Sequence, residues 1–248
     1  MHHAPPGAFF FAQKDNGPSV NRLTGASLKP HCQLLICMSI ELVILDVDGV
    51  LKEVVDPYSL LHRHFGTEEE GRRHFQAFLD GCITYHEFAQ LDAWSWRGQR
   101  VDEVKNVLRS TPYVPGAFEL ADGLRARGIP FVLLSSGFDL NVEDVAADMH
   151  ADAWRCNILH NDRGRIVGSM TVRVPYAGKG PIVREIIQRW DVDPAHVLAV
   201  GDSDTDILAF DEVGHAIAVR PRSEAVSRAA DVTLPDLQNF LSILDNFS

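Results

Sequence analysis

A short apolar run that stops at two carboxylates constrains this chain more than any other feature. The residues from Val43 to Leu45 are all apolar, and Asp46, Asp48 and Gly49 follow. An apolar run without alternation is typical of a strand in the middle of a parallel sheet, where helices cover both faces. Asp46 and Asp48 are two residues apart, so in an extended chain their side chains point the same way. Like charges on one buried side repel each other, which predicts a bound cation or a catalytic use.

Three other interpretations of these aspartates are open from the motif alone. They can be solvated turn residues, since Asp and Gly favour turns. A calcium loop starting at Asp46 fails, because its sixth position is Leu51 instead of Gly and its twelfth is Pro57 instead of Glu. A receiver domain, which accepts a phosphoryl group on an Asp, would also place acids at a strand end. The rest of the chain has to decide.

Length and charge narrow the class of protein. With 248 residues, 46% of them hydrophobic, the chain can bury one ordinary core plus an insertion. The formal net charge is -11, so the overall field repels nucleic acid and anionic membranes. No apolar run reaches the roughly 18 residues that span a bilayer. We therefore expect no nucleic-acid partner and no membrane segment, and an anionic substrate would need a local metal ion or lysine.

The N-terminal segment and the cysteines suggest where the protein works. Residues 1–38 lack a repeating apolar pattern and a secretory signal, and we expect them to be a disordered extension. Met38 lies just before the first strand, which leaves open whether the preceding 37 residues belong to the native protein. A reducing cytosol is favoured, because no CxxC pair or zinc spacing occurs among Cys32, Cys37, Cys82 and Cys156. We expect a cytoplasmic protein.

A helical segment interrupts the α/β pattern directly after the first strand. Residues 53–112 show helical spacing throughout, with a capping box from Thr84 to Glu87. An insertion there predicts a small cap over the end of the strand, where open α/β sheets bind ligands. A packed helical arm without a gating role is the alternative. The spacing of His62, His64 and His74 does not suit a metal site. The core is expected over 39–52 and 113–248.

Polar residues also end or follow later strands. The strand from Ile129 to Leu134 leads into Ser135-Ser136-Gly137, which we expect to open a helix and offer free amides to a phosphate oxygen. A β-hairpin, expected to be an accessory flap, lies between Trp154 and Val174. Lys179 stands at a helix start, where the dipole does not favour a cation, so it suggests a ligand contact.

A second buried strand, His196 to Val200, ends in Gly201, Asp202 and further acids. Asp202 can meet Asp46 if the two strands are neighbours. Four motifs therefore follow in order: an Asp-x-Asp strand end, a hydroxyl strand end, a lysine at a helix start and a Gly-Asp-x-x-x-Asp strand end. This set resembles the haloacid dehalogenase superfamily, in its phosphoserine phosphatase-like branch, from Ile40 to the C-terminus. The resemblance implies a doubly wound, parallel, Rossmann-like sheet with a helical cap and a β-hairpin.

The resemblance also implies roles for individual residues. Asp46 would attack phosphorus, and Asp48 would act as general acid and base. A magnesium ion would be held by the Asp46 side chain, the Asp48 backbone carbonyl and Asp202, with Asp206 in support. The implied ligands of the phosphoryl group and the rest of the substrate are Ser135, Lys179, Ser136, Gly137 and Arg97.

The departures from the branch fall on substrate recognition. A Glu that meets the substrate amine in phosphoserine phosphatases is replaced by Val55, with Asp56 beside it. The cap arginine that holds the substrate carboxylate aligns near Asp92, although Arg97 is close. Thr205 replaces an Asn that is common before the last acid. The chemistry therefore carries over better than the substrate does.

We expect a Mg²⁺-dependent hydrolase of a small phosphorylated metabolite that works through an aspartyl-phosphate. A phosphotransferase or phosphomutase with the same intermediate is the alternative among enzymes. A receiver-like signalling module is the alternative from another class. The sequence does not determine the oligomeric state.

Overall fold

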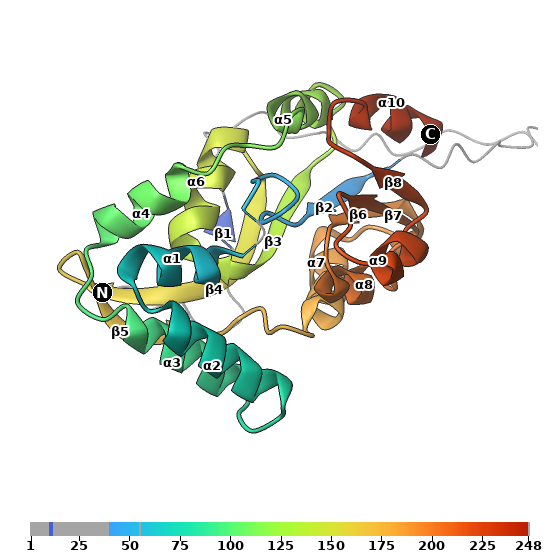
Figure 1. Cartoon of the computed structure of the whole chain (residues 1–248). Helices are drawn as coiled ribbons and strands as arrows, with labels where there is room; N and C mark the ends of the chain where they lie inside the picture. Colours follow the sequence, from blue (N-terminus) through green and yellow to red (C-terminus); the bar gives the residue numbers. More distant parts are fainter. Residues whose placement is uncertain (1–9, 12–39, 55, 248) are drawn as a thin grey trace, which may run out of the picture.

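A parallel sheet with helices on both faces forms the centre of the molecule (Figure 1). The computed structural model describes residues 10–11, 40–54 and 56–247. The strands follow the order β1-β4-β3-β2-β6-β7-β8. The strands from β3 to β8 along this order are β3 (Phe131–Phe138), β2 (Leu42–Leu45), β6 (Val197–Gly201), β7 (His215–Val219) and β8 (Val232–Leu234). All of these pair in parallel, which confirms the predicted α/β class.

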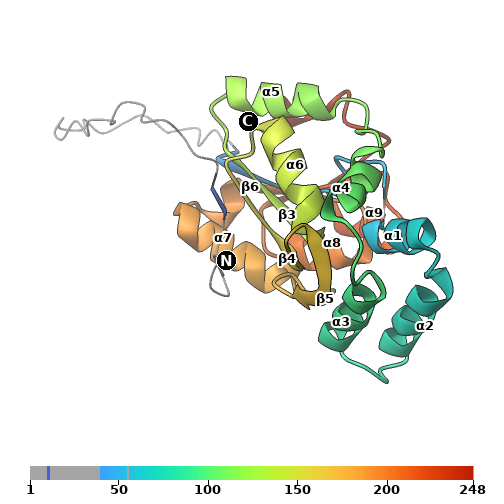
Figure 2. The ribbon, with the colours of Figure 1, turned by 90° about the vertical axis from the view of Figure 1, so that its left-hand side faces the viewer.

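The strand β2 is buried from both sides. Val43 and Leu45 belong to the cluster on one face, whereas Leu42 and Ile44 belong to the cluster on the other. The first face is covered by α5 (Ala117–Ala126), α6 (Asp139–Met149) and α10 (Phe240–Leu244). The second is covered by α7 (Lys179–Trp190), α8 (Asp204–Phe210) and α9 (Glu224–Ala229) (Figure 2). This double cover explains why β2 is apolar without alternation.

The order of strands brings the predicted strand ends together. β2 pairs with β3 on one side and with β6 on the other. The chain therefore adds β3 and β4 to one edge of β2 and later adds β6, β7 and β8 to the opposite edge. In such sheets the crevice at the carboxyl ends of the central strands is the ligand site. Leu45 is in register with Val200, and the Asp46 N–H donates to the Val200 carbonyl at 3.0 Å. The two strands are neighbours, so the condition under which Asp202 can meet Asp46 is fulfilled.

The segment Ser135-Ser136-Gly137 does not open a helix, contrary to the prediction. β3 continues through it to Phe138, and α6 begins at Asp139. The Gly137 N–H donates to Oγ of Ser135 at 2.8 Å, and the register between β3 and β4 shifts here. The Gly137 N–H is satisfied by the Ser135 side chain, and the backbone continues as an irregular strand. The segment therefore does not form a helical turn.

The predicted hairpin is present, but it is part of the main sheet. β4 (Ala153–Asp162) pairs with β3 in its first half and with β5 (Arg165–Thr171) in its second. The turn residues Arg163 and Gly164 have φ values of 47° and 74°, as a two-residue hairpin with strong right-handed twist requires. The hairpin is therefore anchored by a core strand.

Four helices occupy the segment predicted to be helical: α1 (Pro57–Phe65), α2 (Glu68–Leu79), α3 (Tyr85–Ser95) and α4 (Val101–Arg109). The capping box of Thr84 and Glu87 starts α3 as predicted. The side-chain N–H of Gln90 donates to the Met170 carbonyl at 2.6 Å, and the side-chain oxygen of Gln90 accepts the Met170 N–H at 3.1 Å. One hydrophobic cluster, which includes Trp96 and Leu159, joins these helices to the hairpin. The helices are thus built on β5.

Most of the predicted N-terminal extension lies outside the described residues. The exception is β1 (Phe10–Phe11), which pairs antiparallel with β4 at Ala153 and Trp154. The expectation of disorder over all of 1–38 is wrong at these two residues, because main-chain pairing with a sheet edge needs no apolar periodicity. Two 3₁₀ turns, Pro194–His196 and Asp245–Phe247, complete the elements. In the part of the chain that the structure describes, no helix is long and apolar enough to cross a membrane.

Candidate active site

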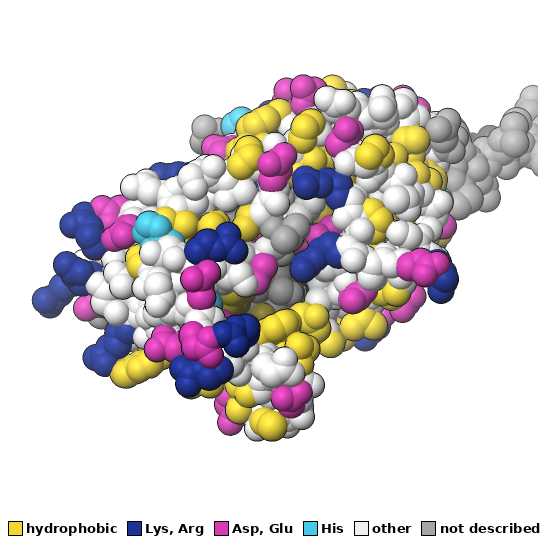
Figure 3. Space-filling model, in the orientation of Figure 1, with side chains coloured by type: hydrophobic (Ala, Val, Ile, Leu, Met, Phe, Trp, Pro, Cys, Tyr) yellow, Lys and Arg dark blue, Asp and Glu magenta, His cyan; other side chains and the backbone are white. Residues whose placement is uncertain are grey.

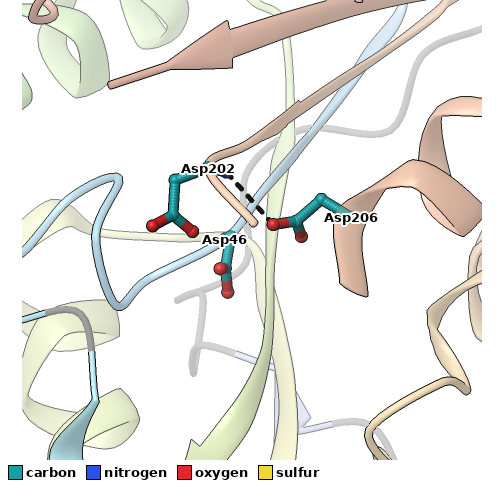
Figure 4. A group of neighbouring side chains, drawn as sticks. All are labelled: Asp46, Asp202 and Asp206. Carbon is teal, nitrogen blue, oxygen red and sulfur yellow. Dashed lines mark hydrogen bonds between the residues drawn. The ribbon is translucent and has the colours of Figure 1, made fainter. Parts of the chain in front are cut away.

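Three aspartates from separate strand and helix ends converge (Figure 4). Asp46 follows β2, Asp202 follows β6, and Asp206 lies in the first turn of α8. One carboxylate oxygen of each lies within 4.8 Å of the others. All three side chains are buried. The structure therefore brings together acids that are 160 residues distant along the chain, from Asp46 to Asp206.

Lys179 is the cation among these acids. Its Nζ donates to Oδ1 of Asp206 at 2.5 Å and lies 3.0 Å from Oδ1 of Asp46. The side chain is 2% exposed, so it is not a solvated loop lysine. Burial disfavours its charge, but the carboxylates of Asp206 and Asp46 outweigh burial and raise the pKa of Lys179. Lys179 is a fixed positive charge at every physiological pH.

Asp206 holds the backbone of the site through hydrogen bonds, whereas Asp202 has a carboxylate oxygen without a hydrogen-bond partner among the described residues. Oδ2 of Asp206 accepts the N–H groups of Asp202 and Ser203 at 3.1 and 2.9 Å, while its Oδ1 faces Lys179. Oδ2 of Asp202 is buried with no hydrogen-bond partner among the described residues. A Cβ at Gly49, where φ is +92°, would lie 2.2 Å from that oxygen. A buried oxygen without a donor, beside the carboxylate of Asp46, fits a hard divalent cation.

The protonation of the acids reflects burial and mutual repulsion. Burial raises the pKa of Asp46, although Lys179 opposes the rise. Burial raises the pKa of Asp202 as well, and the charges of Asp46 and Asp206 add to it. Burial and the charge of Asp46 raise the pKa of Asp48 to about 7. At neutral pH Asp48 can therefore both give and take a proton.

Asp48 is held by two neutral donors. Oγ of Ser135 donates to Oδ2 at 3.0 Å, and the Asn141 amide donates to Oδ1 at 2.8 Å. Asn141 is 3% exposed and comes from the first turn of α6. Asn141 was not identified from the sequence, although an Asn in the helix that follows the Ser135 motif was a usable signal. A Cβ at Gly137 would lie 2.6 Å from Oδ2 of Asp48, so this close approach requires glycine.

A cavity of about 510 Å³ opens over these acids. Its first side, here called the core wall, consists of Asp46, Asp48, Ser135, Ser136, Gly137, Lys179 and Asp202. Its second side, the cap wall, comes from α1, α2 and α3 and consists of Tyr58, His62, Phe75, Tyr85, Phe88 and Asp92. In Figure 3, basic and acidic side chains surround the hollow where the two sides meet. All predicted catalytic residues lie on the core wall.

One carbonyl connects the two walls. The Ser136 carbonyl accepts from the Asn157 amide at 2.7 Å, from the Tyr58 hydroxyl at 3.3 Å and from the Tyr85 hydroxyl at 3.5 Å. Oδ1 of Asn157 accepts the N–H groups of Arg173 and Val174. Oγ of Ser136 is buried without a hydrogen-bond partner among the described residues, which leaves it available to a ligand. These contacts were not predicted, because they join distant segments.

The residues proposed for substrate recognition do not all reach the cavity. Arg97 is exposed, with its guanidinium 4.5 Å from the Trp94 ring centre, and it does not line the cavity. Its prediction as a substrate ligand is not supported, since its side chain lies over Trp94 and beside Gly168 of β5. Asp56 lines the cavity, but its oxygens accept from the Tyr58 N–H and the Ser59 hydroxyl as the N-cap of α1. Val55 lies outside the described residues.

The chain matches known hydrolases over most of its length. A family model described as haloacid dehalogenase-like hydrolase matches residues 43–211. A probable phosphoserine phosphatase of Schizosaccharomyces pombe is 28% identical over 211 residues, which cover 82% of this chain and 70% of that protein. A phosphoserine phosphatase of Wolinella succinogenes is 25% identical over 173 residues, which cover 68% of this chain and 82% of that protein.

Solved structures share the fold. A structure described as a phospho-aspartyl intermediate analogue of phosphoserine phosphatase has a TM-score of 0.71 at 22% identity, covering 83% of this chain and 99% of that chain. A HAD family hydrolase from Salmonella enterica serovar Typhi has a TM-score of 0.76 at 15% identity, covering 84% of this chain and 72% of that chain. At these identities the likeness establishes the fold.

Proposed function

Because the chain belongs to the haloacid dehalogenase-like hydrolase family and is a phosphatase, we propose that it hydrolyses a small phosphomonoester through a phosphorylated Asp46. One observation carries the proposal. Asp46, Asp48, Asp202 and Lys179 converge on one cavity from different strand and helix ends. This family assignment favours a hydrolase over the alternative of a receiver-like signalling module.

The first step transfers the phosphoryl group to Asp46. A carboxylate oxygen of Asp46 forms a bond to phosphorus while the ester P–O bond breaks, and the electron pair leaves on the alcohol oxygen. Asp48 gives that oxygen a proton, for which its pKa of about 7 suits it at neutral pH. Lys179 contacts the phosphoryl oxygens and offsets their negative charge in the transition state. The Ser135 hydroxyl turns from Asp48 to these oxygens when the substrate is bound.

The second step returns the enzyme to its starting state. Asp48, now ionised, takes a proton from water, and the resulting oxygen attacks phosphorus. The bond from phosphorus to Asp46 breaks, and phosphate leaves. Ser136 and Gly137 line this end of the cavity, and we assign them to the phosphoryl group.

The metal proposed for this site is Mg²⁺. The residues that would hold it are Asp46, Asp202 and the backbone carbonyl of Asp48, with Asp206 fixing the loop around Asp202. When bound, Mg²⁺ neutralises the phosphoryl charge and orients the group for attack. Few protein oxygens in a confined site suit its octahedral preference.

The test is phosphate release with water as the only acceptor. We expect p-nitrophenyl phosphate to be hydrolysed in the presence of Mg²⁺, and Asp46→Asn to lower kcat by more than about a thousandfold, because the nucleophile is lost. Asp122→Asn is the matched control, since Asp122 is an exposed carboxylate on α5. Hydrolysis by Asp46→Asn near the rate of the parent chain would overturn the mechanism. Phosphate release only on addition of an alcohol acceptor would favour the phosphotransferase.

A further inference from the structure

The cap wall contains a buried carboxylate that the proposed chemistry does not use. Asp92 lines the same cavity as Asp46, and it is 1% exposed. Its Oδ1 accepts from Nδ1 of His74 at 2.8 Å. Within the described residues, its Oδ2 takes part in no hydrogen bond. An oxygen of a buried side chain that has no donor within the protein is open to a donor from a ligand.

His62 presents a second polar atom beside Asp92. Its Nδ1 lies 2.7 Å from the Thr67 hydroxyl. Its Nε2 lies 3.2 Å from Oδ1 of Asp92 but is not aligned as a hydrogen bond, and it has no other partner among the described residues. The ring packs against Gly71, where a Cβ would lie 2.6 Å from Nε2. This buried nitrogen of a cavity-lining residue is therefore available to a donor from a ligand.

The charges around Asp92 favour a cation. His74 contacts Oδ1 of Asp92, and His62 is not aligned as a donor to it. Two of the arginines that line the cavity, Arg63 and Arg72, have side chains that are 71% and 70% exposed, and each pairs with a neighbouring glutamate. The third, Arg222, lies beside Asp202 on the opposite side, where its N–H donates to the Asp202 carbonyl. These exposed cations are screened by water and do not neutralise a buried acid.

Aromatic rings complete this part of the cavity. Phe88 is stacked on Tyr58 at 5.8 Å and lies 5.6 Å from Tyr85, measured between ring centroids. Phe75 lies 5.8 Å from Phe88. The faces of such rings attract ammonium groups, and the attraction grows when the cation is removed from water. A buried carboxylate that shares a cavity with several rings is therefore suited to an organic cation.

We propose that Asp92 and His62 form a subsite for an ammonium group, so that the substrate is the phosphomonoester of an amino alcohol. This inference rests on the proposed phosphatase function. An ammonium group offers one N–H to Oδ2 of Asp92 and one to Nε2 of His62, while its remaining surface faces the rings. A carboxylate next to the amine, as in L-phosphoserine, would be repelled by Asp92, so simple amino alcohols are the favoured leaving groups.

The experiment compares substrates that differ in one group. The kcat/KM of the full chain with Mg²⁺ is measured for ω-aminoalkyl phosphates of two to five carbons, and for alkyl and hydroxyalkyl phosphates of equal length. For the best chain length, we expect the amine to exceed the alkyl phosphate by about tenfold to a hundredfold, the range of a charged hydrogen bond. Asp92→Asn should bring this ratio close to one. A merely structural role of Asp92 would lower both substrates and leave the ratio unchanged.

Two further variants sharpen the result. Gly71→Ala pushes the His62 ring away and should lower the ratio several-fold, because one acceptor is displaced. Asp80→Asn removes an exposed carboxylate at the end of α2 and should leave the ratio unchanged. A ratio near one in the parent chain, or a lead by hydroxyalkyl phosphates, would overturn the subsite while leaving the phosphatase function intact.

Binding measurements keep the two proposals separate. Calorimetry with ω-aminoalkyl phosphonates and alkyl phosphonates of equal length needs no turnover and no variant. Tighter binding of the amine by about tenfold or more supports the subsite even if Asp92→Asn does not fold. Equal binding contradicts it. If p-nitrophenyl phosphate and every other phosphomonoester resist hydrolysis, the proposed function fails, whatever the phosphonates show.

Discussion

The core wall and the cap wall of the cavity satisfy their charges in opposite ways. On the core wall, Lys179 contacts both Asp46 and Asp206, and Asp48 has two donors. On the cap wall, Nε2 of His62 is buried without a partner among the described residues, Asp92 is contacted by His74, and the Trp96 ring packs on His62. The contacts of the core wall fix the positions of the reacting groups, whereas polar groups of the cap wall are available to a ligand. Chemistry and selectivity are thus assigned to different parts of one cavity.

The walls also differ in how they are held. The acids of the core wall follow central strands, so backbone pairing on both sides sets their positions. The cap wall lies on helices whose placement depends on a shared hydrophobic cluster and on the Gln90 contact with β5. Changes on the core wall should therefore alter kcat, and changes on the cap wall should alter the choice of substrate.

Removing the metal should have the largest effect on kcat, because it acts on the core wall. Chelation should lower kcat by more than about a thousandfold, because Asp46 and Asp202 then repel the phosphoryl group. Added Mg²⁺ should restore activity, whereas Ca²⁺ should not, since its looser coordination misplaces the attacking oxygen. Phosphate release is the measurement. Full activity after thorough chelation would contradict the assignment of the three aspartates.

Asn141→Ala should produce the next largest effect. The variant removes the donor to Oδ1 of Asp48 but keeps the Ser135 contact, so the carboxyl group loses its fixed orientation. We expect kcat to fall by about tenfold to a hundredfold with little change in KM, the range of a positioned acid–base group. Asn106→Ala, at an exposed position on α4, is the control. A change confined to KM would show that Asn141 serves the substrate instead.

A stability prediction concerns Asp139, which lies behind the cavity lining at the start of α6. Burial raises its pKa to about 7, and its Oδ1 accepts the Leu159 N–H. The folded protein therefore keeps a proton that the unfolded chain has lost above about pH 4, so this group makes folding less favourable as pH rises from about 4 to 7. Asp139→Asn should be more stable than the parent chain at pH 8, by at most about 4 kcal/mol, and similar at pH 4. Urea unfolding at both pH values is the measurement. Equal stability at pH 8 would mean that water reaches the carboxylate.

The smallest effect is expected at the carbonyl that joins the walls. Tyr85→Phe removes the most distant of three donors to the Ser136 carbonyl, at 3.5 Å, and keeps the ring. We expect KM to change by no more than about threefold, since a long neutral hydrogen bond contributes little. Tyr58→Phe, whose hydroxyl is at 3.3 Å, is the matched comparison. A tenfold loss of kcat in Tyr85→Phe would move this hydroxyl from the cap wall into the catalytic machinery.

Local patterns in the sequence were sufficient for much of the core. An unbroken apolar run identifies a strand buried on both faces, and acids after two such strands are brought together once the strands are parallel neighbours. The expectation failed at Ser135-Ser136-Gly137, where a side-chain acceptor stabilises an extended backbone. It failed at Phe10–Phe11, where pairing uses only the main chain. These failures share a cause, because the deciding contacts are not encoded in residue periodicity.

The sequence by itself determined the sheet, its order of motifs and the acids at the strand ends. Only the tertiary structure decided that Arg97 faces outward, that Asp56 is an N-cap, and that Asn141 reaches Asp48 across 93 residues. It also placed His74 on Asp92, 18 residues away, inside the cavity. The physical reason is that periodicity fixes which face of an element is buried, whereas a polar pairing depends on how two separate elements pack.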